Sequence, residues 1–150
     1  MEVTIEDASI QQLDRLYEIE MECFDKEAFT KQQIANLLTN YNSVGLVAKI
    51  SGKIVGFVIG MLYVERTALA GHILTIDVST AYRKKGIAQK LLQGIEKIFK
   101  EKGAKTCHLE VREDNIVALR LYQKLGYKKV ARLKGYYRDA NGIYLRKDLA

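Results

Sequence analysis

The sequence is poor in cysteine, has no proline or tryptophan, and contains no long apolar run. Its two cysteines, Cys23 and Cys107, are far apart in the chain, so they suggest neither a disulfide scaffold nor a zinc site. No apolar segment approaches the roughly 20 residues that span a bilayer. The N-terminal residues MEVTIED lack the basic and apolar regions of a secretory signal. We therefore expect a cytoplasmic protein with no metal site and no membrane partner.

Nothing in the composition divides the chain into parts. It has no low-complexity stretch, no Gly/Ser linker and no evident internal repeat. Its contents of 48% hydrophobic and 28% charged residues are ordinary for a globular protein. A chain of 150 residues is also long enough to bury a substantial core. We expect residues 1–150 to form one domain.

The charge balance is basic, with 24 lysines and arginines against 18 acidic residues and a formal net charge of +6. This excess favours anionic partners such as nucleotides, phosphorylated cofactors, ribosomal surfaces or acidic peptides. A solvated, lysine-rich surface explains the same charge, so the charge alone does not select one of these partners.

The spacing of apolar residues predicts a mixed sheet with helices packed against it. A helix capped by Asp7 and a second helix, opened by a capping box from Thr30 to Gln33, precede a central group of strands. Gly103 and Gly126 are placed to end two later helices. The expected strands are residues 3–5, 43–50, 54–64, 70–78, 106–112, 129–137 and 143–149. The order is β-α-α-β-β-β-α-β-α-β-β, an α/β (α+β) fold with a mixed sheet of about seven strands.

Residues 82–92, with the sequence YRKKGIAQKLL, form a basic turn between a strand-like run and a long amphipathic helix. Gly86 permits close backbone approach, and the N–H groups and dipole at a helix start favour a bound phosphate. The chain has neither G-x-x-x-x-G-K-[ST] nor G-x-G-x-x-G, which argues against a nucleoside triphosphatase or a dinucleotide fold. A solvated helix start with an incidental glycine is the alternative to a phosphate site.

A second cluster of motifs lies downstream of this turn. It comprises LEVR at residues 109–112, Asn115, Ala118, Tyr122 and LGY at residues 125–127. Together with residues 83–88, these motifs resemble the GCN5-related N-acetyltransferase (GNAT) superfamily, and the resemblance covers nearly the whole chain. Members of the superfamily bind the pyrophosphate of acetyl-coenzyme A (acetyl-CoA) through backbone amides of an R/Q-x-x-G-x-G/A motif. The third position of that motif is Ala88 here.

The resemblance implies which residues would bind acetyl-CoA as a co-substrate. The acetyl and pantetheine groups would lie along the strand edge at Ile76, Asp77 and Val78, held by backbone groups as in β-strand addition. Asn115 and Ala118 would border the pantetheine arm. The pyrophosphate would be bound by Arg83, Lys84, Lys85, Gly86, Ile87, Ala88 and Gln89.

Within the superfamily, the sequence resembles protein N-terminal acetyltransferases of the bacterial ribosomal-protein alanine (RimI) type and of the archaeal and eukaryotic Ard1 type. GHILTIDV at residues 71–78 and GYY at residues 135–137 are typical of them. The resemblance implies that the substrate is the N-terminal α-amine of a ribosomal protein or of nascent chains, which is compatible with ribosome association. The first residues of that substrate would contact Phe24, Phe29, Tyr136 and Tyr137.

The segment at residues 24–30 departs from the F-P-W-S/T pattern of the bacterial enzymes, because the proline is missing. In the family this loop contacts the first residue of the substrate. The departure therefore leaves the preferred N-terminal residues of the substrate open.

Acetyl transfer needs a base that takes a proton from the substrate ammonium, and Glu110 is the leading candidate. Strand alternation places His108, Glu110 and Arg112 on one face, and a polar face on a covered strand suggests a cleft. From spacing alone, a solvent-facing Glu110 paired with Arg112 is the better interpretation. The resemblance reverses this order, because the glutamate at this position is the base in the bacterial ribosomal-protein enzymes.

Two further residues are candidates for proton transfer. The resemblance to Ard1-type enzymes implies that His72 assists deprotonation through ordered water, with a structural histidine as the alternative. Tyr122 is the candidate general acid, because a phenol pKa of about 10 is close to that of a thiol leaving group. A core aromatic residue beside Leu119 and Leu125 is the alternative for Tyr122. His108 is expected to be a bystander.

Two other functions fit the sequence. An acetyltransferase of the same superfamily could act on a protein lysine or on a small-molecule amine. A non-catalytic RNA- or ribosome-binding module is the alternative from another class. The chain lacks an aromatic RNP-like motif, however, and its basic residues are spread along it. We therefore expect no specific nucleic-acid partner.

Overall fold

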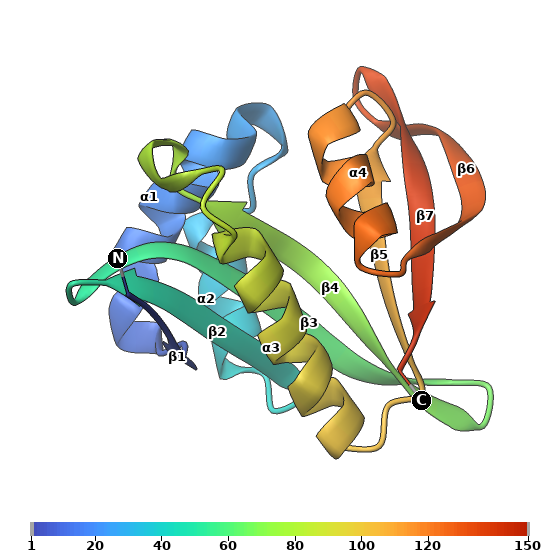
Figure 1. Cartoon of the computed structure of the whole chain (residues 1–150), viewed down its shortest axis with the longest axis horizontal. Coiled ribbons are helices and arrows are strands. Elements are labelled where there is room, and N and C mark those ends of the chain that lie inside the picture. Colours follow the sequence, from blue (N-terminus) through green and yellow to red (C-terminus); the bar gives the residue numbers. More distant parts are fainter. Residues whose placement is uncertain (1, 150) are drawn as a thin grey trace.

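A seven-stranded mixed sheet forms the centre of the molecule, in the order β1-β2-β3-β4-β5-β7-β6 (Figure 1). The computed structural model describes residues 2–149. Strands β4 and β5 are parallel, and all other neighbours are antiparallel. The strands are β1 (Val3–Asp7), β2 (Ser43–Ile50), β3 (Lys53–Glu65), β4 (Ala68–Val78), β5 (Thr106–Arg112), β6 (Lys128–Tyr137) and β7 (Ala140–Asp148). The predicted fold class and element order are confirmed.

Helices cover both faces of the sheet (Figure 1). Helices α1 and α2 pack on one face around a core that includes Phe57, whereas α3 packs on the other face around Ile95. Helix α4 contributes Tyr122 to the α3 core. The helices are α1 (Leu13–Phe24), α2 (Lys31–Thr39), α3 (Ile87–Glu101) and α4 (Ile116–Lys124).

The start of the first helical segment differs from the prediction. Ser9, not Asp7, caps it: the Ser9 hydroxyl accepts a hydrogen bond from the Gln11 backbone, and the Gln12 side chain accepts one from the Ser9 backbone. The prediction was wrong because Asp7 still belongs to β1, where it pairs with β2. A short 3-10 turn then leads into α1.

The last strand also begins earlier than expected. Residue 143 was the predicted start of β7, but Tyr137 pairs directly with Ala140, so the connection from β6 to β7 is a tight turn. Ala140, Asn141 and Gly142 therefore belong to the strand, and only Arg138 and Asp139 form the turn. This brings Asp139 and the tip of the hairpin close to the end of β5, as the ion pairs described below show.

Helix α3 approaches β3 and β4 closely because two glycines make room for Phe99. A Cβ atom on Gly71 would lie 2.3 Å from the Phe99 ring, and one on Gly60 would lie 2.7 Å from it. The Phe99 ring is completely buried. Since Gly71 precedes His72 in β4, this packing fixes the strand at the residue next to a candidate catalytic side chain.

Strands β4 and β5 separate shortly after they meet. They pair only over Ala70–His72 and Thr106–His108. Beyond this point β4 continues to Val78, paired with β3 alone, and β5 continues to Arg112, paired with β7 alone. Figure 1 shows the two strands diverging toward the ends that lead to α3 and α4. The sheet therefore has two facing edges whose backbone groups do not pair with each other.

Among residues 2–149, no helix combines the length and the apolar character needed to cross a membrane. Cys23 and Cys107 are both free. Burial raises the pKa of Cys23 to about 11 and that of Cys107 to about 12, so both side chains are thiols at neutral pH.

Candidate active site

The edge of β4 that faces β5 offers backbone groups to a ligand. The Ser79 N–H donates to the Val55 carbonyl on β3, and successive residues of a strand direct their backbone groups to opposite sides. Ile76 and Val78 therefore face the free edge, whereas the backbone of Asp77 faces β3. The Val78 carbonyl already accepts hydrogen bonds from the Arg83 and Cys23 side chains.

The structure brings two sequence-predicted residues into direct contact where the strands part. His72 Nε2 lies 2.8 Å from one Glu110 carboxylate oxygen and 3.1 Å from the other. The two side chains are 31% and 17% exposed, so the pair is sheltered but reachable. In the tautomer that donates Nε2–H to the carboxylate, Nδ1 is left as an acceptor. The arrangement is that of an imidazole oriented by a carboxylate.

Arg112 does not pair with Glu110. Its guanidinium contacts the Glu27 carboxylate, and it donates to Asp114 at 2.9 Å and to Asp139 at 2.8 Å. The alternative in which Glu110 and Arg112 form an ion pair is therefore wrong. Three carboxylates around Arg112 instead tie together the α1–α2 connection, the end of β5 and the β6–β7 hairpin.

Tyr122 lies inside the molecule, with 6% of its surface exposed. Its ring packs edge-on against Tyr127, with centroids 5.9 Å apart. Burial raises the pKa of Tyr122 well above its ordinary value, and the Asp77 carboxyl raises it further. The phenol therefore holds its proton more firmly than the sequence argument assumed, and it is a weaker acid before a substrate binds.

The turn before α3 has the backbone of an anion site. Lys84 and Gly86 both adopt left-handed conformations, with φ of 64° and 79°, and Gly86 is the N-cap of α3. Alternating conformations of this kind turn successive N–H groups toward one point, and the helix start adds its dipole. Lys84 and Lys85 are exposed, whereas the Arg83 side chain folds back onto β4.

The remaining residues of this turn differ in their surroundings. The Ile87 side chain is fully buried in the core, and Ala88 packs against it. Gln89 is half-buried. These side chains can contribute to a pyrophosphate site only through their backbone groups or, for Gln89, through its exposed part.

Asn115 and Ala118 meet at the start of α4. The Asn115 side chain accepts a hydrogen bond from the Ala118 N–H at 3.1 Å, so Asn115 is the N-cap of this helix. Residues three or four apart on a helix share one face, which places Ala118 and Tyr122 on the same face of α4. Ala118 thus lies about one turn, and Asn115 about two turns, before the candidate acid.

Asp77 was predicted to lie on the strand edge that binds acetyl-CoA, but its backbone faces β3 and its side chain is buried. Its carboxyl is buried, lies 2.5 Å from the Thr75 hydroxyl, and has one oxygen without a partner among the described residues. The Thr75 hydroxyl also lies 3.0 Å from the Glu20 carboxylate. One hydroxyl hydrogen serves only one of these contacts, so the other needs a protonated carboxyl. Burial, reinforced by Glu20, raises the pKa of Asp77 well above its ordinary value and assigns the proton to Asp77.

The four predicted substrate-contact residues lie on two segments that Arg112 connects. Phe24 ends α1 with 38% of its surface exposed, and the Phe29 N–H donates to Glu20. Tyr136 and Tyr137 pack against each other in β6, with centroids 5.0 Å apart. The Arg112 guanidinium lies 5.8 Å from the centroid of the Tyr137 ring.

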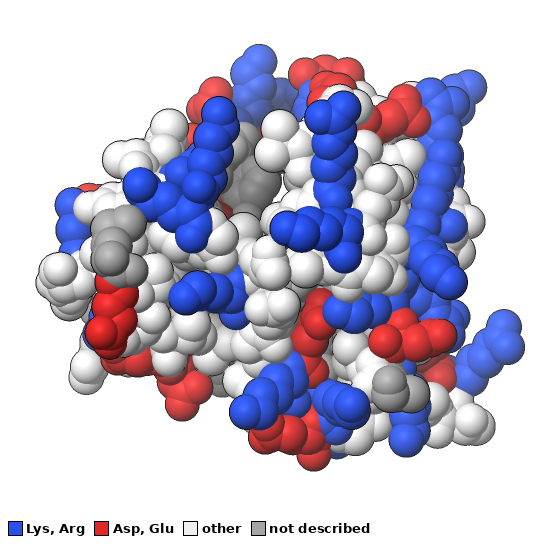
Figure 2. All heavy atoms as spheres, viewed as in Figure 1, with Lys and Arg blue, Asp and Glu red and all other residues white. Residues whose placement is uncertain are grey.

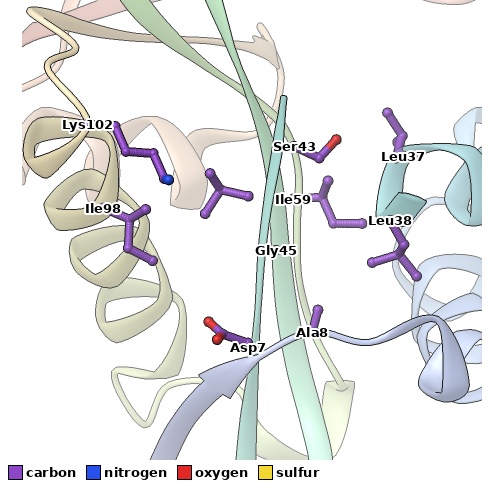
Figure 3. Close-up of a pocket in the computed structure, with 10 residues that line it drawn as sticks. Asp7, Ala8, Leu37, Leu38, Ser43, Gly45, Ile59, Ile98 and Lys102 are labelled. Atoms are coloured by element: carbon purple, nitrogen blue, oxygen red, sulfur yellow. The ribbon is translucent and has the colours of Figure 1, made fainter. Parts of the chain in front are cut away.

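A separate pocket of about 260 Å³ lies between α2, α3 and the start of β2 (Figure 3). Figure 3 shows Leu38 and Ile98 on opposite sides of β2, with Lys102 above and Asp7 below. None of the sequence-predicted site residues lines it. The pocket is therefore distinct from the gap between β4 and β5.

Lysines and arginines are unevenly placed on the surface. Residues 116–150 contain nine of the 24 basic residues but only two of the 18 acidic residues. Figure 2 shows Lys and Arg side chains over much of this face, including the edge where β6 and β7 lie in Figure 1. The other fifteen basic residues are spread over residues 1–115.

Sequence reasoning missed the partners that organise the site. Glu27 and Asp139 lie 85 and 27 positions away from Arg112, and no motif links them. Glu20 likewise meets Thr75 across 55 positions. Each contact joins segments that are distant in the sequence, so no local signal distinguished these acidic residues.

Residues 13–127 match the family described as acetyltransferase (GNAT) family. The chain belongs to this family, as the resemblance of its motifs suggested. In sequence, it is 36% identical to an N-alpha-acetyltransferase of Saccharolobus solfataricus over 117 residues, which cover 72% of this chain and 70% of the relative.

Solved structures agree with this assignment. Ard1 from Thermoplasma volcanium superposes with a TM-score of 0.89 and 26% identity, covering 100% of this chain and 99% of that one. The ribosomal-protein-S18-alanine N-acetyltransferase from Escherichia coli superposes with a TM-score of 0.90. Its identity is 22%, over 99% of this chain and 95% of that one, so it shows the same fold.

Proposed function

We propose that the protein transfers the acetyl group of acetyl-CoA to the N-terminal α-amine of proteins. The observation that carries this proposal is the His72–Glu110 contact, which lies where β4 and β5 part and beside a free strand edge. The His72–Glu110 pair lies next to the free edge of β4, which can bind amide groups. Acetyl-CoA and the substrate amine could therefore both bind in the gap between β4 and β5. Family membership and the N-alpha-acetyltransferase relative support the same reaction.

The binding of acetyl-CoA would use the backbone more than side chains. The edge groups of Ile76 and the N–H of Val78 suit the amides of the pantetheine arm, whereas the Val78 carbonyl already accepts from Arg83 and Cys23 and the groups of Asp77 are directed to β3. The left-handed residues Lys84 and Gly86 suit the pyrophosphate. The site would be completed by Arg83, Lys85, Ile87, Ala88 and Gln89 at the turn and by Asn115 and Ala118 at the start of α4.

Glu110 and His72 would act together as the base. His72 Nε2–H donates to Glu110, so Nδ1 can take a proton from the substrate ammonium, directly or through one water. An α-amine titrates near pH 8, so a weak base is sufficient. The free amine then attacks the thioester carbonyl, a C–N bond forms, and the C–S bond breaks.

Tyr122 would protonate the departing thiolate of coenzyme A. Its raised pKa keeps the phenol protonated until the negative charge develops on sulfur. The phenolate formed in this step takes up, directly or through water, the second proton that the attacking nitrogen loses as the amide forms. The α-ammonium proton on the His72–Glu110 pair leaves separately, so both groups return to their starting states.

The first residues of the substrate would lie between Phe24 and Phe29 on one side and Tyr136 and Tyr137 on the other. Arg112 would hold these two walls together through Glu27 and Asp139. We further infer that residues 1–150 act as one domain, since strands from both ends of the described chain join the same sheet. A cytoplasmic location and ribosome association are part of the proposal.

A direct test is to incubate the protein with acetyl-CoA and a panel of short peptides that vary in residues one and two. The proposal predicts acetylation at the α-amine, measured by mass spectrometry of fragments. Acetylation confined to lysine side chains or polyamines would contradict it and favour the alternative acetyltransferase. RNA binding with steep salt dependence, without coenzyme A affinity, would favour a binding module.

A further inference from the structure

Tyr127 touches the candidate acid Tyr122 at two places. Its buried ring packs edge-on against the Tyr122 ring, with centroids 5.9 Å apart, and its N–H donates to the Tyr122 carbonyl at 2.9 Å. Gly126, which precedes Tyr127, has a φ of 98°, so the chain reverses there and brings Tyr127 back to the end of α4. A displacement of Tyr127 would therefore be passed on to Tyr122.

The Tyr127 hydroxyl is held by a carboxylate inside the molecule. It donates to Glu96 of α3 at 2.7 Å, and the Cys107 sulfur of β5 lies 3.1 Å from the same hydroxyl. The phenol has one hydrogen, and the carboxylate is the stronger acceptor for it. Tyr127 thus contacts α3 and β5 as well as α4.

Lys147 of β7 fixes the Glu96 carboxylate in turn. Its Nζ donates to the other Glu96 oxygen at 2.7 Å and lies 5.6 Å from the centroid of the Tyr127 ring. The Lys147 and Glu96 side chains are only 25% and 10% exposed. Hydrogen bonds between charged groups are strong, and a buried carboxylate that loses its partner is costly. The position of the Tyr127 ring is therefore tightly defined.

The proposed reaction requires this kind of support for Tyr122. A general acid directs its one hydrogen to the leaving sulfur, so packing around the Tyr122 ring must set where the hydroxyl lies. Proton transfer needs hydrogen-bond distance, and a misplacement of about 1 Å can lower a rate by about 10²-fold. Tyr127 supplies a packing surface that its own hydrogen bond keeps in place.

We propose that Tyr127 is a positioning residue for Tyr122, and that Glu96 and Lys147 hold Tyr127 in place. This inference rests on the proposed function, in which Tyr122 protonates the coenzyme A thiolate. In this role Tyr127 touches no reacting atom and acts only through the Tyr122 ring. Its loss should therefore slow the chemical step and leave the binding of both substrates unchanged.

A double-mutant cycle in the peptide acetylation assay tests this role. Tyr127→Leu removes the ring, and we expect the single-turnover rate to fall about tenfold. The KM for the peptide and the calorimetric affinity for acetyl-CoA should stay near those of the wild type. In a Tyr122→Phe background, Tyr127→Leu should cause no further loss, because no acid is left to position. Losses that multiply in the double variant, or weaker acetyl-CoA binding at an unchanged rate, would overturn the inference.

Conservative variants test the part played by the Tyr127 hydroxyl and Glu96. Tyr127→Phe keeps the ring and the buried volume, so it remains informative if Tyr127→Leu does not fold. Its rate should lie between those of the wild type and Tyr127→Leu. Glu96→Gln keeps an oxygen that accepts the Tyr127 hydrogen and should retain most of the rate, whereas Glu96→Leu should lower it about threefold. Wild-type rates in both Tyr127→Phe and Glu96→Leu would overturn the inference.

Leu46→Ala is the control for a general loss of stability. Leu46 is buried on β2, which β3 separates from β4 and the proposed site. The variant should unfold at a lower temperature but keep the wild-type single-turnover rate while it is folded. A tenfold slower rate in Leu46→Ala would overturn the inference, because destabilisation alone would then explain Tyr127→Leu. An inactive wild type, or a Tyr122→Phe variant with the wild-type rate, would instead contradict the proposed function.

Discussion

His72 Nε2 lies 2.8 Å from the Glu110 carboxylate, although the two residues are 38 positions apart in the chain. The contact forms at the last point where β4 and β5 run side by side. The two side chains are therefore in direct hydrogen-bond contact, and both face the same gap. This explains why the sequence could not assign the base to one of them.

Replacing His72 or Glu110 separately should show how much each residue contributes to base catalysis. We expect Glu110→Gln to lower kcat/KM by about 10²–10³, since general base catalysis contributes on this scale. His72→Gln, which keeps a donor to Glu110 but no titrating ring, should lower it as well. Steady-state kinetics and calorimetric acetyl-CoA affinity measure the two effects. If a variant loses acetyl-CoA affinity but keeps its kcat, the role of His72 and Glu110 as the base is contradicted.

Tyr122→Phe should lower kcat much more than it weakens acetyl-CoA binding, because the ring still fills the same buried space. The loss should shrink with an acetyl donor whose thiol leaving group has a low pKa, since that thiolate needs no proton. Single-turnover rates with two thioesters measure this difference. Equal kcat in the variant and the wild type would refute the acid role.

Gly86→Val should strongly reduce acetyl-CoA affinity. Gly86 has a φ of 79° at the start of α3, a conformation that a β-branched residue avoids, although a Cβ atom would meet nothing within 4 Å. Gly103→Val is the matched control, because Gly103 has a φ of 98° and equally open surroundings at the other end of α3. We expect the control to lose stability but keep its affinity in calorimetry. Unchanged affinity in Gly86→Val would overturn the pyrophosphate assignment.

Arg112→Met should raise the KM for the peptide about tenfold and leave acetyl-CoA affinity unchanged. The substitution leaves Glu27 and Asp139 without their shared partner. The α1–α2 connection and the hairpin tip are then no longer linked by ion pairs to one guanidinium. Arg132→Met is the control, since Arg132 forms a more exposed pair with Glu113 alone. If both variants raise the KM for the peptide equally, the claim that Arg112 holds the two peptide-contacting segments together is contradicted.

Asp77→Asn should stabilise the protein at alkaline pH. The pKa of Asp77 is raised in the folded state, so its contribution to stability is complete below its ordinary value of 3.8 and is lost as the pH rises through the folded value. Asparagine does not ionise and avoids this loss. We expect a Tm about 2–4 °C higher than that of the wild type at pH 8, for a gain of about 1 kcal/mol. Thermal unfolding at pH 8 and pH 4 should show the difference shrinking in acid; a constant difference would contradict the buried proton.

Much of the fold follows from local signals in the sequence. The capping box at Thr30, the glycines that follow α3 and α4, and the apolar spacing of α3 all act within a few residues, so pattern reasoning finds them. The ends of helices and strands were predicted less accurately. Ser9, and not the predicted Asp7, is the N-cap, because β1 extends further than its apolar residues indicate.

The candidate site depends more on long-range contacts. Strand alternation correctly placed His108, Glu110 and Arg112 on one face, but it could not show that Glu110 meets His72 while Arg112 turns to the hairpin. The register between β4 and β5 decides these contacts, and three residue pairs set it. The protonation of Asp77 likewise depends on α1, which is distant in sequence.

The most direct test of the central claim is the position of the acetyl group on a peptide that carries both a free α-amine and an internal lysine. The wild type should acetylate the α-amine in the presence of acetyl-CoA, and fragment masses should place the label on the first residue. A matched peptide with a blocked N-terminus should remain unmodified, and Glu110→Gln should show little product. Label on the lysine of the blocked peptide, or full activity of Glu110→Gln, would contradict the account.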